Sequence, residues 1–383
     1  MAGTRLTFRG KAPAFRSDNS RSRPTRCNGP DDPQVVDVTS EDDILRWSHE
    51  WIALLDETPR ASFFNGPEWA AAWWTTVGQR APTRLARWDD EEGQLVAVAH
   101  ASRQSERLSD RLPLTLPVIT MLGAGPGAAD HLAFPCRDEY RERVWTWFDN
   151  QRGRVPAVLD NLDVRDGAPP LPSTARRIGS QSCPTMPLPA EIRSSLAKKI
   201  RTYSNRLDRE GITITSHPPG SVNPEILRRF DDLQQQRRAA QGRTSMLEDE
   251  HVSLLEAITR HSSGSRGLAA VTAHRAERLV GVLLGFATAK RFEFYQIGWD
   301  PAVRNLSVGT VLIDRAIHDA EERGAVEFDF LRGEESYKLR FGAVSVEDEH
   351  WTIPTGPTGW VLTARDFVTE HRGKNEPAGA NDE

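Results

Sequence analysis

Two stretches of the chain, about half its length apart, show the same order of sequence patterns, and this repetition limits the folds that the chain can adopt. GQLVAVAHAS (93–102) and ERLVGVLLGFA (277–287) are each the second arm of an expected hairpin that follows two helical patterns. Helix-like and strand-like patterns alternate elsewhere, which is typical of α/β proteins. An internal duplication explains the repetition, and so does a β-meander pattern common to two different domains. With 383 residues, two domains are expected, because a single hydrophobic core stops growing at roughly 250–300 residues.

The individual elements are expected from apolar spacing and from capping residues. In the first half, Ser40 is the expected N-cap of a helix, and the helices, hairpin and strands are expected over 40–55, 66–78, 83–102, 116–122, 138–151 and 156–162. In the second half, Asn223 is an expected N-cap, and the elements are expected over 223–242, 254–258, 267–287, 291–299, 300–324, 325–331 and 351–354. Residues 1–36 and 372–383 are expected to be disordered tails, because neither carries an apolar pattern to bury.

A basic helix is expected between the two halves, within residues 188–211 and ending at Gly211. Its apolar residues form one stripe at helical spacing, namely Leu196, Ile200, Tyr203 and Leu207. Basic residues fill the rest of its surface, namely Lys198, Lys199, Arg201 and Arg206. Two interpretations remain open: a helix that faces an anionic ligand or RNA, and a packed helix whose basic face is solvated.

Net charge, the length of the apolar runs and the spacing of the cysteines argue against several classes of protein. A net charge of −5 argues against a protein that coats nucleic acid, and no DNA partner is expected. The longest apolar run, LVGVLLGFATA, is shorter than the roughly 20 residues that span a bilayer, so no membrane span is expected. Cys27, Cys136 and Cys183 are widely spaced, which suggests neither a disulfide framework nor a metal site and fits a reducing cytoplasm.

The segment DPAVRNLSVGTVLIDRAIHDAEERG (300–324) holds the strongest candidate for a binding site. It places small residues at a turn between an apolar strand and an amphipathic helix. A helix N-terminus has unpartnered N–H groups and partial positive charge, so it stabilises a bound phosphate. An ordinary connection with Ser307 as N-cap explains the turn equally well, and no Gly-Lys-Ser/Thr follows as in a P-loop. The expected phosphate site consists of Arg304, Ser307, Val308, Gly309 and Thr310.

The run from this strand to residue 342 resembles the GNAT acyltransferase superfamily, in particular its CelD-like branch, which is related to the FemABX peptidyltransferases. In GNAT proteins the pyrophosphate of acyl-CoA sits on a Gln/Arg-x-x-Gly-x-Gly/Ala loop, and residues 304–309 match it except that Ser307 replaces the first glycine. A Phe-Asp-Phe-x-x-Gly segment followed by Tyr-Lys is the second shared feature. The resemblance is most specific over 265–345. It implies tandem GNAT-like domains over 37–190 and 191–371, each a mixed, mostly antiparallel sheet flanked by helices.

The resemblance also implies catalytic roles in the second half. Lys338 is expected to face the acyl carbonyl and to supply positive charge to the oxyanion that forms there; as a surface lysine it would have no such role. Tyr337 is expected to protonate a departing thiolate; the alternative is an aromatic side chain whose role is packing. Asp329 alternates with two phenylalanines along a strand and is expected to bind the substrate amine or to orient Lys338, or else to cap a neighbouring turn.

Three further residues are weaker candidates for substrate contacts. Tyr295, on the strand before the phosphate turn, is a possible acid that equally suits the core. Asp130 and His131 follow GAGPG, and the related branch often has an aspartate near this place; they are candidates for a base or a substrate contact. The glycines at 123–127 are not interpreted as dinucleotide-binding, because no helical pattern follows them.

Three functions are compatible with these observations. The leading one is an N-acyltransferase that moves an acyl group, acetyl in the simplest case, from acyl-CoA to an amine of a small molecule, amino sugar or peptide. The second is a FemABX-like transferase that uses aminoacyl-tRNA, which the basic helix motivates; tRNA is a partner only in this case. The third is a non-catalytic binding protein of polysaccharide synthesis that keeps the fold.

Overall fold

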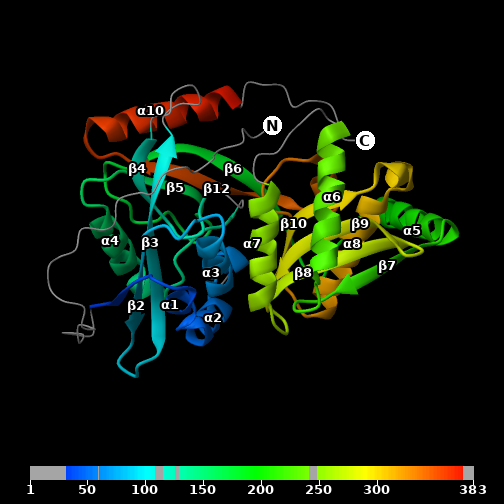
Figure 1. The fold of residues 1–383 in the computed structure, drawn as a ribbon, viewed down its shortest axis with the longest axis horizontal. Coiled ribbons are helices and arrows are strands. Elements are labelled where there is room, and N and C mark those ends of the chain that lie inside the picture. The colour runs from blue at the N-terminus through cyan, green and yellow to red at the C-terminus, as the bar shows by residue number, and fades with distance from the viewer. Residues whose placement is uncertain (1–31, 59, 108–114, 126–128, 241–247, 374–383) are drawn as a thin grey trace. The chain divides into compact units, whose positions relative to one another are not determined.

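The computed structural model describes residues 32–58, 60–107, 115–125, 129–240 and 248–373, whose helices and strands are labelled in Figure 1. These residues form two compact units. Unit 1 comprises the described residues up to Gln181 together with those from Glu347 onward, and unit 2 comprises Ser182–Val346. The chain therefore returns to unit 1 after completing unit 2, which the expected division at residue 190 did not include.

Unit 1 is built on a sheet in which most neighbouring strands are antiparallel. The strand order is β1 (Gln34–Asp37), β2 (Thr83–Asp89), β3 (Leu95–Arg107), β4 (Thr115–Thr120), β5 (Ala157–Asp163) and β12 (Val344–Ile353), which enters unit 1 at Glu347. Among the strands that the structure describes in this unit, β4 and β5 are the parallel pair, through the pairing of Ile119 with Ala157. β12 joins the sheet by pairing antiparallel with β5, and this pairing returns the end of the chain to unit 1.

The helices of unit 1 enclose an aromatic core. They are α1 (Glu41–Leu45), α2 (Ser48–Glu57), η1 (Phe63–Asn65), α3 (Pro67–Thr75), η2 (Asp138–Tyr140), α4 (Arg141–Arg152) and α10 (Gly356–Gly373). The single helix expected over 40–55 is in fact two, because the backbone at Trp47 leaves helical geometry, with φ −112° and ψ 16°. Trp51, Trp69 and Trp73 are fully buried, so aromatic side chains provide much of the apolar surface that this unit buries.

Unit 2 repeats the strand pattern of unit 1. Its strand order is β7 (Ile212–His217), β8 (Gly267–Arg275), β9 (Arg278–Ala287), β10 (Arg291–Trp299), β11 (Glu327–Asp329) and β6 (Arg176–Pro187), which enters unit 2 at Ser182. Again four antiparallel strands are followed by one parallel strand and one antiparallel strand. The fourth and fifth strands form the parallel pair in both units. The expectation of mixed, mostly antiparallel sheets is thus confirmed in both units.

Helices cover both faces of the unit 2 sheet (Figure 1). They are α5 (Ser194–Arg209), α6 (Pro224–Ala240), α7 (Glu248–His261), η3 (Pro301–Leu306), α8 (Val308–Glu322) and α9 (Ser336–Arg340). In α5 the expected apolar stripe is confirmed, since Ile200 and Leu207 are buried and Leu196 and Tyr203 pack against the same core. Asn223 caps α6 by accepting a hydrogen bond from the N–H of Ile226 at 3.0 Å.

The expected tails lie largely outside the described residues. Residues 1–31 and 374–383 are not described, while Gln34–Asp37, at the end of the first expected tail, form β1 and pair with β2. The end of the helix expected at Gly242 also falls outside the described residues. Of the helices that are described, none combines the length and the apolar character needed to span a bilayer.

Candidate active site

The pairing between the parallel strands β10 and β11 of unit 2 ends before β10 does. β11 has three residues, and its pairing with β10 is limited to Arg291, Phe292 and Glu293. From Phe294 to Trp299, β10 therefore has no partner strand on its β11 side among the residues that the structure describes. Ligands of α/β sheets commonly bind where parallel strands part at their carboxyl ends, so this end of β10 is the first place to look for a site.

The phosphate turn expected from the sequence lies directly after β10. Ser307 ends η3 and begins α8 with φ 56° and ψ 36°, the left-handed region that favours glycine. This conformation explains why glycine is common at the matching position of the GNAT loop. A Cβ atom added to Gly309 would lie 3.4 Å from the ring of Trp299, an ordinary contact, so the end of β10 and the start of α8 are packed together.

The first turn of α8 contains backbone N–H groups that have no hydrogen-bond acceptor among the described residues. The N–H of Thr310 is bonded to the carbonyl oxygen of Ser307 at 3.1 Å. In the described part of the chain, no hydrogen bond is recorded from the N–H of Val308 or Gly309, and the side chain of Ser307 does not cap the helix. Arg304 is exposed beside this turn. The five residues expected to bind phosphate therefore lie within one short segment, and two of their N–H groups have no acceptor among the described residues.

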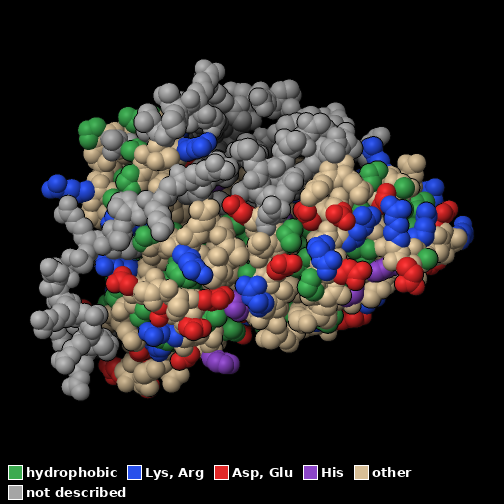
Figure 2. Space-filling model, in the orientation of Figure 1, with side chains coloured by type: hydrophobic (Ala, Val, Ile, Leu, Met, Phe, Trp, Pro, Cys, Tyr) green, Lys and Arg blue, Asp and Glu red, His purple; other side chains and the backbone are tan. Residues whose placement is uncertain are grey.

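The basic helix α5 touches the same turn. Arg206 donates from Nη1 to the carbonyl oxygen of Asn305 in η3 at 3.0 Å. Figure 2 shows Lys and Arg side chains gathered at the right of the view, over α5. The exposed basic residues of this helix are Lys198, Lys199, Arg201, Arg206 and Arg209. The phosphate turn therefore lies next to a positively charged helix face.

Tyr295 occupies a bulge in β10. The pairing of β10 with β9 shifts register between Phe294 and Gln296, so Tyr295 is the extra residue and its backbone is released from the ladder. The Tyr295 hydroxyl lies 3.1 Å from Nε2 of His251 in α7, and the two rings stack with centroids 5.7 Å apart. Both side chains are partly exposed. His251 was not among the residues expected from the sequence.

Lys338 is buried, with its ammonium group surrounded by oxygen atoms. Nζ donates to the carbonyl oxygens of Leu331, Arg332 and Gly333 at 3.2, 2.8 and 3.3 Å, and it lies 2.9 Å from the carboxylate of Glu335. The lysine therefore fixes the loop that follows β11. Its neighbour Tyr337 is partly buried and packs against the core shared by α5 and α8.

Asp329 belongs to a buried charged cluster at the end of β11. Its carboxylate forms an ion pair with Arg291 and accepts a hydrogen bond from the N–H of Leu331 at 2.7 Å. Arg291 also pairs with Glu327 at 2.7 Å, and Glu293 lies opposite Asp329 in the sheet. The side chains of Arg291, Glu293 and Asp329 are almost fully buried. Arg291 and Glu293 were missed, although charges that alternate with phenylalanines in an apolar strand are a signal for them.

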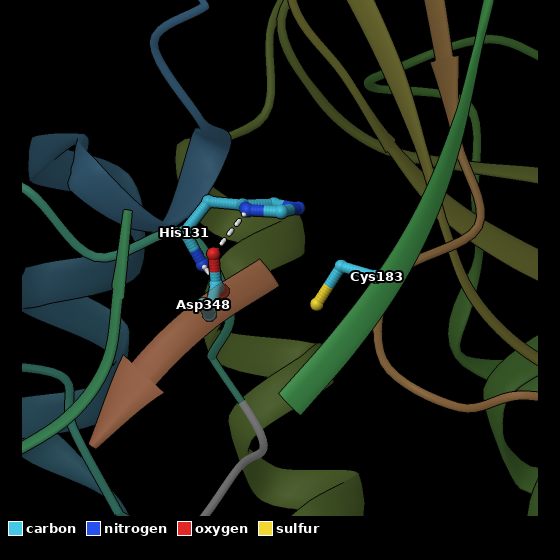
Figure 3. A group of neighbouring side chains, drawn as sticks. All are labelled: His131, Cys183 and Asp348. Carbon is cyan, nitrogen blue, oxygen red and sulfur yellow. Dashed lines mark hydrogen bonds and ion pairs between the residues drawn. The ribbon is translucent and has the colours of Figure 1, made fainter. Parts of the chain in front are cut away.

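Asp130 and His131 lie in unit 1, and both are buried. Figure 3 shows the imidazole of His131 beside the carboxylate of Asp348, whose Oδ1 lies 2.8 Å from Nδ1 and whose Oδ2 accepts from the His131 N–H at 2.6 Å. Burial raises the pKa of Asp348, while the nearby His131 acts in the opposite direction. When Nδ1 carries the proton shared with Asp348, Nε2 is the basic nitrogen. Asp348 had no signal in the sequence.

Side chains of unit 1 hold the segment around His131 in an uncommon conformation. His131 has φ 53°, which is rare for a residue other than glycine. Asn65 donates to the His131 carbonyl at 2.9 Å and accepts from the N–H of Ala133, while Asn161 donates to the carbonyl of Ala129 at 2.8 Å. Backbone strain that buried polar groups maintain is often found at functional sites.

The comparisons with known proteins agree with this architecture. Residues 194–339 match the family model described as an acetyltransferase (GNAT) domain. FemX is similar in structure with a TM-score of 0.57 at 11% identity, over 83% of this chain and 96% of FemX. L-PGS from Bacillus licheniformis has a TM-score of 0.53 at 11% identity, over 88% of this chain and 98% of L-PGS.

A conserved protein of unknown function from Bacteroides thetaiotaomicron is similar to the same degree, with a TM-score of 0.53 at 12% identity, over 84% of this chain and 99% of that protein. At such identities the structures share a fold, and they say nothing further about activity. No curated protein matches the chain in sequence. Residues 194–339 are thus similar to GNAT acetyltransferase domains, over less than half of the chain.

Proposed function

We propose that this protein is an N-acyltransferase that moves an acyl group, acetyl in the simplest case, from acyl-CoA to an amine. The observation that carries the proposal is the start of α8, where the N–H groups of Val308 and Gly309 follow a left-handed residue, have no acceptor among the described residues, and lie in a turn that packs against the end of β10. A pyrophosphate at this turn would accept both N–H groups and gain from the helix dipole. Arg304 would reach a second phosphate oxygen, and the acyl-bearing arm would lie along β10.

The chemistry requires an amine to lose a proton and to attack the carbonyl carbon of the thioester. The oxyanion that forms needs a hydrogen-bond donor or a positive charge, and the departing thiolate needs a proton. Tyr337 and Tyr295 are the two tyrosines proposed to supply that proton. Asp329 is proposed to attract the protonated amine, as one of three carboxylates that share the single guanidinium of Arg291.

The role proposed for Lys338 combines charge with support. Its ammonium group lies within 3.3 Å of three carbonyl oxygens, so its charge is already engaged with the loop over residues 331–333. We therefore propose that Lys338 contributes to the oxyanion environment by fixing this loop, and that any direct contact with the acyl carbonyl requires the ammonium to leave one of the three oxygens.

Asp130 and His131 are proposed to serve the acceptor amine. A histidine that is held by a carboxylate through Nδ1 presents Nε2 as a base, the arrangement that recurs in proton-abstracting sites. The acceptor is proposed to be an amine of a small molecule, amino sugar or peptide. Asp130 is buried next to His131 and adds negative charge near Asp348. This charge would stabilise the imidazolium that forms when His131 takes up a proton.

The second candidate is a transferase that uses aminoacyl-tRNA. The specific observation in its favour is the exposed basic face of α5, whose Arg206 is bonded to the phosphate turn. A pyrophosphate bound at the turn alone would not need the positive charges along α5. A polyanion that extends from the turn along this helix would be attracted by them.

Ligand binding distinguishes the two donors. We expect acetyl-CoA to raise the melting temperature, because a ligand that binds only the folded state stabilises it by about 2.7 kcal/mol at one hundred times its Kd. Mass spectrometry of ligands that copurify with the protein identifies the natural donor, and uncharged tRNA serves as the competing ligand. Stabilisation by tRNA and none by any acyl-CoA would replace the leading proposal by the second. Stabilisation by acyl-CoA without transfer to any of a broad set of amines would favour a non-catalytic binding protein.

A further inference from the structure

A pocket of about 340 Å³ lies beside the end of α8 in unit 2. Two arginines line it, Arg315 in α8 and Arg323 directly after the last residue of α8, together with Phe292 near the start of β10. At 1.5 Å per residue, the helix separates Arg323 from Gly309 of the phosphate turn by roughly 21 Å. The pocket is therefore distinct from the proposed donor site, and the proposed chemistry does not use it.

The side chain of Arg323 contains two hydrogen-bond donors that lack an acceptor. Nε and Nη2 are shielded from solvent, and neither has a partner among the residues that the structure describes. The guanidinium carbon lies 5.5 Å from the centroid of the Phe292 ring, a contact that stabilises the charge but offers the N–H groups no oxygen atom. Burial lowers the pKa of Arg323, while the charge of Asp319 opposes this effect. Buried donors of a charged group are costly without an acceptor, so these two call for an explanation.

Arg315 brings a second guanidinium with unused donors to the pocket. Its Nε donates to Oγ of Ser216 at 2.9 Å and lies 2.8 Å from Oδ1 of Asp319. Both contacts use the same nitrogen, and within the described ranges no hydrogen bond is recorded from Nη1 or Nη2 of Arg315. Asp319 is thereby engaged, and Glu322, the second acidic residue of the lining, is exposed, where solvent and salt screen its charge.

We infer that this pocket binds a small oxyanion, a carboxylate or a phosphate, through Arg323 and Arg315. The N–H groups on Nε and Nη2 lie on one edge of a guanidinium and point in parallel, so they match two oxygen atoms of either anion. Arg323 lines the pocket, and no hydrogen bond is recorded from its side chain to another described residue, so rotation of the side chain brings this edge to the ligand. The Nη groups of Arg315 bind the same oxyanion. This ligand is separate from the acyl donor and the acceptor, so the inference goes beyond the proposed function.

The test measures anion binding in a protein whose phosphate turn is blocked, because inorganic phosphate has two places to bind in the parent. In Gly309→Glu we expect inorganic phosphate or succinate to raise the Tm relative to sodium chloride of the same ionic strength, as followed by differential scanning fluorimetry. Calorimetric titration gives the Kd of each anion, and the tighter one identifies the class of ligand. Adding Arg323→Met should weaken binding of that anion at least about tenfold, because a hydrogen bond to a charged group is worth about this factor or more. Arg260→Met, an exposed change at the end of α7, is the matched control and should leave the Kd unchanged.

Two further measurements separate ligand binding from a structural role of Arg323. Methionine keeps an apolar side chain against Phe292 and removes a charge whose donors lack acceptors, so the midpoint of urea unfolding should not fall in anion-free buffer. Arg323→Lys keeps the charge without the parallel donors and should bind the anion more weakly than the parent, which tests the inference even if the methionine variant does not fold. Binding of neither anion would overturn the inference, and so would a Kd that both variants leave unchanged.

Discussion

His131 and Asp348 are 217 positions apart in the chain, yet one carboxylate binds both the ring and the backbone of the histidine. Asp348 Oδ1 lies 2.8 Å from Nδ1 and Oδ2 accepts from the backbone N–H at 2.6 Å. Both side chains are completely buried, and the histidine has positive φ. The pair thus fixes the conformation of one segment and the tautomer of one imidazole, and its removal should have consequences for stability as well as for activity.

We predict that Asp348→Ala lowers the free energy of unfolding by about 3–5 kcal/mol, the range for breaking a buried charged pair by removing one partner. Asp348→Asn should cost less, because an amide oxygen still accepts from the His131 N–H. Urea unfolding followed by tryptophan fluorescence measures the change. Glu347→Ala is the control, since Glu347 is exposed on the same strand. An Asp348→Ala variant as stable as the control would mean that the pair does not hold the segment.

Local patterns were sufficient to predict most of the helices and strands. The hairpins β2–β3 and β8–β9 and the apolar stripe of α5 follow from residue spacing within a few turns of chain. The strands β6 and β7 were not expected. RRIGSQSCPTMP is short of large apolar residues and becomes a strand by pairing with a neighbouring strand. ITITSH does carry a local signal that was missed, because β-branched isoleucine and threonine alternate in it.

The candidate site was predictable only where it is contiguous in sequence. The turn over residues 304–310 is a local motif, and it adopts the left-handed conformation that its small residues suit. The contacts of His131 with Asp348 and of Tyr295 with His251 join distant segments. Such pairs depend on sheet order and on register, which no local pattern encodes. The cage of carbonyl oxygens around Lys338 likewise depends on how the loop after β11 closes.

His100 should make the stability of the protein depend on pH. Burial lowers the pKa of His100 from 6.5 to about 3, and its Nδ1 accepts from the N–H of Leu122 at 3.0 Å. Below pH 6.5 His100 therefore binds a proton in the unfolded chain but not in the folded chain. The free energy of unfolding consequently falls as the pH falls below 6.5. Between pH 7.5 and pH 5 the loss from this group is about 2 kcal/mol.

The check is urea unfolding of the parent and of His100→Asn at both pH values. Asparagine keeps an acceptor for the Leu122 N–H but does not titrate, so the variant should lose about 2 kcal/mol less than the parent over this interval. Contributions from other groups cancel in the comparison. Parallel pH profiles would show that His100 is accessible to protons in the folded state.

Lys338→Met should reveal how much of the role of Lys338 is structural. The substitution leaves the carbonyl groups of Leu331, Arg332 and Gly333 without their buried donor, so we expect the free energy of unfolding to fall by at least about 1–3 kcal/mol. Turnover should fall with it, while Arg340→Ala, an exposed change on the same short helix, should affect neither quantity. A loss of turnover of about 10² with unchanged stability would instead assign the charge to the acyl carbonyl.

Gly309 provides the most direct test of the phosphate turn, because the turn tolerates a small side chain but not a negative charge. A Cβ atom at this position meets Trp299 and Ile297 at 3.4 and 3.5 Å, which are ordinary contacts, so Gly309→Ala should fold normally and gain slightly from the better helix propensity of alanine. Gly309→Glu should also fold, but its carboxylate would lie at the helix N-terminus and repel a pyrophosphate. We expect the thermal shift with acetyl-CoA to persist in the alanine variant and to vanish in the glutamate variant, as followed by differential scanning fluorimetry. Calorimetric titration with acetyl-CoA then gives the Kd of each. If Gly309→Glu binds acetyl-CoA as tightly as Gly309→Ala does, the start of α8 is only a connection between β10 and the helix, and the donor must bind elsewhere.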